Sequence, residues 1–209
     1  SMENTLLVGD YLFVSKFAYG YSKHSFPWSP PLFEGRVWSA PPQRGDVVVF
    51  KLPLRPWEDY IKRVVGLPGD RIQMIDSVLY INGEPCKQER TDDYVAVDES
   101  GYEMRIPRYR ETLPNGVTHD ILDSEADKPG ADNTQEFIVP AGHYFMMGDN
   151  RDNSSDSRMP DSGVGFVPEE NLVGRADIIF FSTDGSAQIW EVWKWPWSFR
   201  YSRIFRTID

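Results

Sequence analysis

The stretch DYIKRVVGLPGDR, residues 59–71, places two adjacent cations inside an apolar run. Its β-branched, aromatic and aliphatic residues predict a half-buried strand over residues 60–67, ended by a turn at residues 68–70. Successive side chains of a strand point to opposite faces, so Lys62 and Arg63 must point apart. If both faces are covered, one cation is buried, and a buried lysine tends to lose its proton and become a base. At a sheet edge, both side chains would instead reach solvent.

The rest of the chain also favours strands and turns. Aromatic residues make up 14% of the 209 residues, Gly and Pro number 16 each, and runs with helical periodicity are scarce. We expect an all-β protein in which residues 1–83 and 136–209 form a discontinuous core of mainly antiparallel sheet. The segment of residues 84–135, which is rich in acidic residues, is predicted to form a smaller, β-rich inserted cap domain. Further strands are predicted at residues 11–14, 44–51, 71–84 with a hairpin at Asn82-Gly83, 136–140, 143–150 and 176–182.

Composition excludes several classes of function. The net charge of −10 and the lack of a basic stripe argue against a nucleic-acid partner. The single cysteine, Cys86, excludes an internal disulfide, and no Cys/His cluster has the spacing of a zinc site. No stretch approaches the roughly 20 apolar residues of a membrane-spanning helix. The abrupt beginning at Ser1 suggests a shortened form of a longer protein, and Ser1-Met2 is either native or a cloning remnant.

The C-terminal segment is rich in tryptophan interleaved with basic residues. Two interpretations stay open: packing against the sheet, or a belt at the membrane–water interface, where indole rings and basic side chains are favourable. The tryptophans concerned are Trp190, Trp193, Trp195 and Trp197.

A second polar run, GDNRDNSSDSR at residues 148–158, follows directly from an apolar strand. It predicts either a hydrophilic hairpin loop or a hydrogen-bond network that supports a site, because Arg–carboxylate pairs are rigid. Spacing alone does not decide between them.

Three stretches in this order, SMENTL (1–6), YIKRVVGLPGD (60–70) and GDNRDNSSDSR (148–158), closely resemble the bacterial type I signal peptidases. RGDVVVFK (44–51) lies between the first two, as in that family. YRETL (109–113) and GFVPEENLVGR (165–175) resemble its Gram-negative branch, so the resemblance covers nearly the whole chain. It implies a serine endopeptidase anchored in the bacterial inner membrane, with its catalytic domain on the periplasmic side, that removes signal peptides from exported preproteins. It implies no metal or organic cofactor.

The resemblance implies that Ser1 is the nucleophile and Lys62 the general base, a Ser-Lys dyad in place of a Ser-His-Asp triad. A lysine can serve as a base only if burial lowers its pKa from about 10.4 towards neutrality. Ser154 corresponds to a serine that hydrogen-bonds and orients the lysine, and Asp156 and Arg158 correspond to supporting positions.

Family substrates carry small residues one and three positions before the cleaved bond, a preference that shallow apolar pockets explain. The substrate would bind in an extended form and add a strand to an exposed sheet edge. Matching positions imply a pocket lined by Met2, Leu6, Leu12, Val49, Tyr60 and Ile61.

Two departures from the family pattern affect the expected activity. Asn4 stands where the family has proline. The family also takes one oxyanion donor from a serine two residues before the nucleophile, so we expect the chain as printed to be slower by roughly 10²–10³ than a longer form.

Two alternatives remain: another Ser-Lys processing peptidase, such as a self-cleaving repressor, or a non-catalytic β-rich binding module in which Lys62 is a solvated edge residue.

Overall fold

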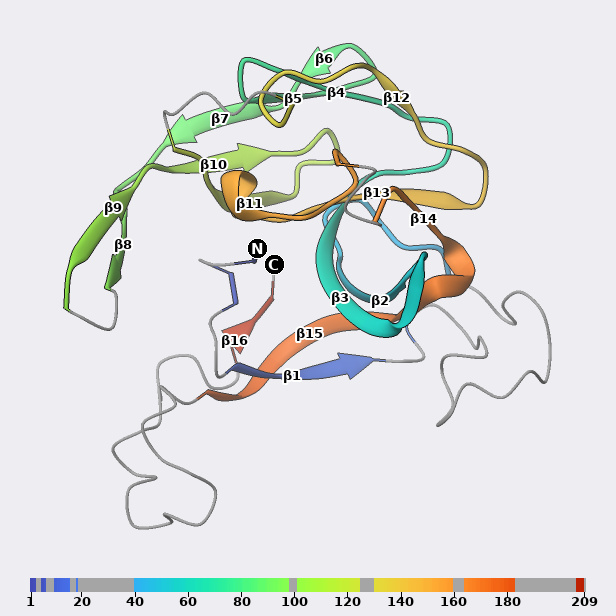
Figure 1. The fold of residues 1–209 in the computed structure, drawn as a ribbon, viewed down its shortest axis with the longest axis horizontal. Helices are drawn as coiled ribbons and strands as arrows, with labels where there is room; N and C mark the ends of the chain where they lie inside the picture. The colour runs from blue at the N-terminus through green and yellow to red at the C-terminus, as the bar shows by residue number, and fades with distance from the viewer. Residues whose placement is uncertain are drawn as a thin grey trace.

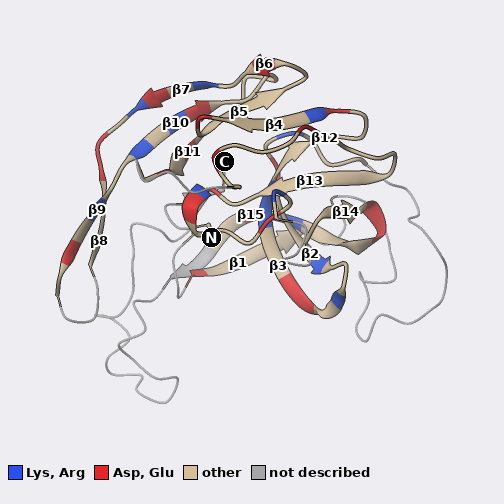
Figure 2. Cartoon of the chain, turned by 45° about the horizontal axis from the view of Figure 1, so that its top comes forward, with Lys and Arg blue, Asp and Glu red and all other residues tan. Residues whose placement is uncertain are grey.

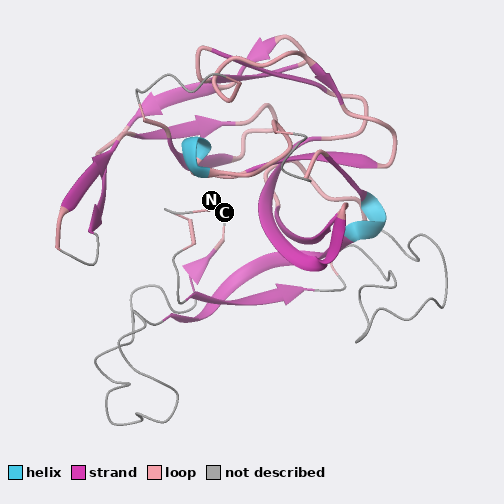
Figure 3. Cartoon of the chain, viewed as in Figure 1, coloured by secondary structure: helices cyan, strands magenta, loops and turns pink. Residues whose placement is uncertain are grey.

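The computed structural model describes residues 1–2, 5–6, 10–15, 18, 40–97, 101–124, 130–159, 164–182 and 206–208. Within these ranges the chain consists of strands and two short 3-10 helices, η2 (Arg151–Asn153) and η4 (Glu169–Asn171) (Figure 3). All pairs of named strands are antiparallel. The predicted all-β class is therefore confirmed. None of the described helices is long and apolar enough to cross a bilayer.

The largest sheet has seven strands in the order β1-β15-β2-β3-β13-β14, with β16 paired to β15. In Figure 1, β2 and β3 form a strongly curved ribbon beside β13. The lysine strand predicted over residues 60–67 is the second half of β3, and β2 pairs with it from Arg55 to Arg63. The strands are β1 (Asp10–Ser15), β2 (Val47–Leu52), β3 (Arg55–Gly66), β13 (His143–Met147), β14 (Phe166–Pro168), β15 (Leu172–Ser182) and β16 (Arg206–Thr207).

The remaining described strands form three smaller sheets, in the orders β12-β4-β5-β6, β11-β10-β7 and β8-β9. The second and third lie wholly within the predicted inserted segment, whereas β6 of that segment pairs with β5 of the predicted core. The division into two domains stays a prediction. The strands are β4 (Arg71–Ile75), β5 (Val78–Ile81), β6 (Glu84–Pro85), β7 (Lys87–Arg90), β8 (Tyr94–Val97), β9 (Glu103–Ile106), β10 (Arg108–Thr112), β11 (Thr118–Leu122) and β12 (Phe137–Ile138).

The predicted Asn82-Gly83 hairpin is present between β5 and β6, with φ of 57° and 87° at the two residues. A second tight turn, at Asp76-Ser77, splits the run before it into β4 and β5. Its residues have φ of 47° and 62°, a left-handed conformation that side chains other than Gly, Asn and Asp rarely adopt. Because the turn contains no glycine, the sequence carried little signal for it.

The core covers both faces of β3 where β3 meets β13. Val64 and Met146 belong to one buried cluster, and Val65 and Phe145 belong to another. Alternate residues of each strand therefore enter different cores. This two-sided burial determines the environment of the adjacent cations.

Candidate active site

Lys62 lies in the interior of β3, with only 3% of its surface exposed. Its Nζ donates a hydrogen bond to Ser1 Oγ. Ser1 is held in place by its own carbonyl oxygen, which accepts a hydrogen bond of 2.9 Å from the backbone N–H of Asn150. Figure 1 shows the N-terminus next to η2, which Asn150 caps. The structure thus brings together the two side chains predicted to form the dyad.

Burial lowers the pKa of Lys62 from 10.5 to about 8, since an ammonium group loses its hydration in the interior. The nearby Asp156 and Asp149 oppose this effect by favouring the charged form, and Arg158 adds to it. An appreciable fraction of Lys62 is therefore neutral near pH 8, as a general base requires.

Arg63 is buried as well, on the opposite face of β3 from Lys62. Its Nε and Nη2 donate to Asp149 Oδ1 and Oδ2, each at 2.9 Å, and its Nη1 donates to the Gly45 carbonyl oxygen at 2.7 Å. Although burial opposes charge on Asp149, Arg63 holds its pKa down at about 2. Both cations are thus buried, rather than one, because both faces of β3 are covered and Arg63 has a carboxylate partner.

Asp156 and Arg158 form a second buried ion pair within the polar run 148–158. Arg158 Nε lies 3.0 Å from Asp156 Oδ1, and Nη2 lies 2.9 Å from Oδ2. The backbone N–H of Gly148 also donates to Asp156, at 3.1 Å. Although burial opposes charge on Asp156, Arg158 and these hydrogen bonds lower its pKa. The run is therefore a hydrogen-bonded network rather than a solvated loop.

Ser154 lies beside this network, and its Oγ is buried. That oxygen has no hydrogen-bond partner among the described residues, although the hydroxyl favours the ionised form of the neighbouring Asp156. The expected hydrogen bond between Ser154 and Lys62 is not formed in this structure. The orienting role of Ser154 stays a prediction.

An open pocket of about 350 Å³ lies at Ser1 and Lys62. Tyr60 and Ile61 line it, as the sequence predicted. Asp59, Asn153 and Ser155 also line it and were not singled out as site residues, although each lies within one of the quoted stretches, 59–71 or 148–158. The complete lining is Ser1, Asp59, Tyr60, Ile61, Lys62, Asn153 and Ser155.

The other predicted lining residues lie behind this pocket. Met2, which is 4% exposed, is packed in one apolar cluster with Leu6, Leu12 and Ile61. Val49 is the cross-strand neighbour of Ile61. These residues therefore back Ile61 and are not part of the lining itself.

A buried charge network on the side of the inserted segment was not predicted as part of the site. Arg151 Nη1 donates to Glu111 Oε1 at 2.9 Å, and His119 Nε2 lies 3.4 Å from Glu111 Oε2. Although burial opposes charge on Glu111, Arg151 and His119 hold its pKa well below its ordinary value. The sequence signals were that Glu111 lies within the YRETL motif and Arg151 within the polar run 148–158.

Figure 2 shows basic and acidic residues interspersed along β7 and β10. The predicted membrane-facing residues Trp190, Trp193, Trp195 and Trp197 lie outside the described residues.

Comparison with known proteins gives the family of the chain. The family described as "Signal peptidase, peptidase S26" matches residues 1–181. Signal peptidase I of Rickettsia typhi (strain ATCC VR-144 / Wilmington) is 42% identical over 228 aligned residues, which span 100% of this chain and 82% of the relative. Signal peptidase I of Rickettsia bellii (strain OSU 85-389) is 41% identical over 226 aligned residues, spanning 100% of this chain and 75% of the relative.

Among solved structures, a signal peptidase I from Enterococcus faecalis V583 has 27% sequence identity and a TM-score of 0.37, covering 65% of this chain and 97% of that one. The family assignment rests on the sequence matches, which run through the Ser1 and Lys62 segments. The chain belongs to the type I signal peptidases of family S26, which are serine endopeptidases.

Proposed function

We propose that this chain cleaves signal peptides from exported preproteins after small-x-small sites, with Ser1 as nucleophile and Lys62 as general base. The observation that carries the proposal is the hydrogen bond between Lys62 Nζ and Ser1 Oγ, made where Lys62 is 3% exposed. A hydroxyl becomes an effective nucleophile when a neutral base accepts its proton. Lys62 can fill that role because its pKa is lowered to about 8.

The chemistry follows from the position of these two side chains. Ser1 Oγ attacks the scissile carbonyl carbon while its proton passes to Lys62 Nζ. The tetrahedral intermediate collapses when the lysine ammonium returns that proton to the departing amine, which leaves an acyl ester on Ser1. Water then attacks the ester, with neutral Lys62 again as the base, and frees Ser1.

Asp156 and Arg158 support this cycle without touching the reacting atoms. Their ion pair fixes the loop that carries Ser154, and the negative charge of Asp156 stabilises the ammonium that Lys62 becomes during acylation. We assign Ser154, Asp156 and Arg158 positioning roles.

The open side of β3 supports binding of the substrate as an added strand. On one side, β2 pairs with β3 from Arg55 to Arg63, whereas on the other side β13 pairs only with Arg63, Val64 and Gly66. Among the described strands, residues 59–61 are therefore paired on one side only, next to the pocket. An extended peptide can form main-chain hydrogen bonds there, whatever its sequence.

Selectivity for small residues is proposed to come from the wall of this pocket. Ile61 lies in the wall of the pocket. Met2, Leu6 and Leu12 pack against it in one apolar cluster and restrict its movement away from the pocket. A bulky side chain next to the scissile bond would have to displace this cluster.

We place the reaction at the periplasmic side of a bacterial inner membrane, with Trp190, Trp193, Trp195 and Trp197 as candidate membrane contacts.

The test is cleavage of a preprotein whose signal peptide ends in Ala-x-Ala, with mass spectrometry of the new N-terminus. We expect a single cut after the second alanine and no cut above background by Ser1→Ala. Replacing either alanine by phenylalanine should slow cleavage by about 100-fold or more. Equal rates for the alanine and phenylalanine substrates would refute the selectivity, and an active Ser1→Ala variant would refute the nucleophile.

A further inference from the structure

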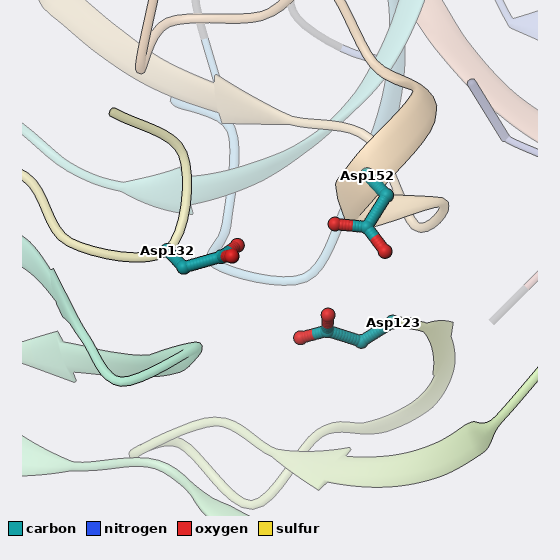
Figure 4. Close-up of side chains that lie close together, drawn as sticks. All are labelled: Asp123, Asp132 and Asp152. Atoms are coloured by element: carbon teal, nitrogen blue, oxygen red, sulfur yellow. The ribbon is translucent and has the colours of Figure 1, made fainter. Parts of the chain in front are cut away.

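Three aspartates outside the proposed dyad converge at one point of the fold (Figure 4). Asp123 directly follows β11, Asp132 lies in the segment before β12, and Asp152 lies in η2. One carboxylate oxygen of each lies within 4.8 Å of the other two. Asp123 and Asp132 are buried, at 5% and 4% exposed. Side chains from three separate parts of the chain therefore direct negative charge into one small volume.

The Asp123 carboxylate is the clearest sign that a ligand is needed there. Its Oδ1 is buried and has no hydrogen-bond partner among the described residues. Figure 4 shows this carboxylate directed towards those of Asp132 and Asp152. A buried carboxylate oxygen without a hydrogen-bond donor destabilises the fold, because it has lost its hydration and gained no hydrogen bond.

The nearby arginines are already committed to other carboxylates. Arg151 is paired with Glu111, and Arg158 is paired with Asp156. Burial together with the charges of Asp152 and Asp132 raises the pKa of Asp123 to about 6, although Arg151 and Arg158 favour its ionised form.

We propose that Asp123, Asp132 and Asp152 bind a divalent cation, with Ca²⁺ as the ion that fits best. Carboxylate oxygens are hard ligands suited to Ca²⁺ and Mg²⁺. Ca²⁺ accepts carboxylate oxygens in flexible, irregular coordination, whereas Mg²⁺ demands near-ideal octahedral geometry. Three carboxylate oxygens from separate parts of the chain, all within 4.8 Å of one another, therefore suit the less demanding ion. Water completes the coordination.

A cation at this point would connect the inserted segment to the polar run of the active site. The backbone N–H of Leu122 already donates to the Asp149 carbonyl oxygen at 2.8 Å, and that of Ser124 donates to Asp152 Oδ2. Asn150, two residues before Asp152, holds the Ser1 carbonyl oxygen. Cation binding would thus stabilise the loop against which Ser1 rests. This inference does not depend on the proposed cleavage reaction.

The test is the thermal unfolding of the 209-residue protein in EDTA, in about 10 mM CaCl₂ and in about 10 mM MgCl₂. A site with a Kd of roughly 10⁻⁴–10⁻³ M should raise Tm by roughly 3–10 °C in CaCl₂. Asp123→Asn and Asp132→Asn should remove that rise. The matched control is Glu103→Gln, which neutralises an exposed acid of β9 and should keep the full rise.

The variants also report on folding by themselves. Because each removes a negative charge from a crowded cluster, their Tm in EDTA should equal or exceed that of the wild type. Equilibrium dialysis with ⁴⁵Ca²⁺ should give about one bound ion per wild-type chain and none for Asp123→Asn. A wild-type Tm that is unchanged by CaCl₂, or an equal rise in Asp123→Asn, would overturn the site. A larger rise in MgCl₂ than in CaCl₂ would overturn the choice of ion.

Discussion

Arg63 and Asp149 form a bidentate ion pair in which each side chain is only 1% exposed. The pair joins β3, next to Lys62, to the beginning of the polar run 148–158. Thr5 Oγ1 also donates to Asp149 Oδ2, so the segment that carries Ser1 is attached at the same carboxylate. One buried pair therefore fixes the three parts of the chain that meet at the active site.

Breaking this pair should destabilise the protein more than removing both partners. Arg63→Met and Asp149→Leu each leave an uncompensated buried charge, and each should cost about 3–5 kcal/mol of unfolding free energy. The double variant Arg63→Met/Asp149→Leu should cost less than either single variant. Urea denaturation measures all three. As a control, Arg55→Met in the exposed Arg55–Glu58 pair should change stability by about 0.5 kcal/mol or less. Strict additivity of the buried variants would contradict this account.

Replacing Lys62 by methionine should stabilise the fold while abolishing the proposed activity. The pKa of Lys62 is 10.5 in the unfolded chain and about 8 in the folded chain. Below pH 8 the folded state therefore carries the full free-energy cost of burying a charged lysine. That penalty is on the order of 3 kcal/mol, and Lys62→Met removes it. Chemical denaturation at pH 7 should show the gain, and the gain should shrink between pH 8 and 10.5. A variant less stable than wild type at pH 7 would argue against a strained, buried amine.

Gly148→Ala should impair activity through direct contact with the dyad's surroundings. A Cβ at residue 148 would overlap Ser154 Oγ and lie 2.6 Å from the Ser1 carbonyl oxygen. Because a displacement of about 1 Å at the reacting atoms can cost about 100-fold, we expect kcat/KM to fall by about that factor. Gly101→Ala is the control, because a Cβ at residue 101 meets nothing within 4 Å. The φ of 85° at Gly101 makes the substitution destabilising to the fold, but kcat/KM should be unchanged. Equal effects of the two variants on kcat/KM would be inconsistent with this contact.

The elements nearest to Lys62 could be predicted from the sequence because their signals are local. Alternation along residues 60–67 predicted that Lys62 and Arg63 point apart, and the resemblance to the signal peptidases implied that Ser1 is the partner of Lys62. The Asn82-Gly83 turn was equally predictable from its dipeptide. The Asp76-Ser77 turn was not, since its backbone conformation is imposed by the pairing of β4 with β5 rather than by a glycine.

Long-range charge pairing could not be predicted in the same way. Arg151 and Glu111 lie 40 residues apart, and although each lies within a quoted motif, no sequence pattern pairs one with the other. The convergence of Asp123, Asp132 and Asp152 likewise depends on how the inserted segment folds back onto η2. The orienting role of Ser154 stays a prediction, because its hydroxyl lies near Gly148 and Asp156 in this structure.

The pH dependence of kcat/KM for preprotein cleavage, measured from about pH 6 to 10, tests the Ser1–Lys62 dyad most directly. Since kcat/KM reports the pKa of the free enzyme, it should rise about tenfold per pH unit below an apparent pKa near 8 and then level off. Lys62→Ala should lose about 10²–10⁴ in rate together with this rise. A flat profile between pH 6 and 8, or wild-type rates in Lys62→Ala, would contradict the assignment of Lys62 as the general base.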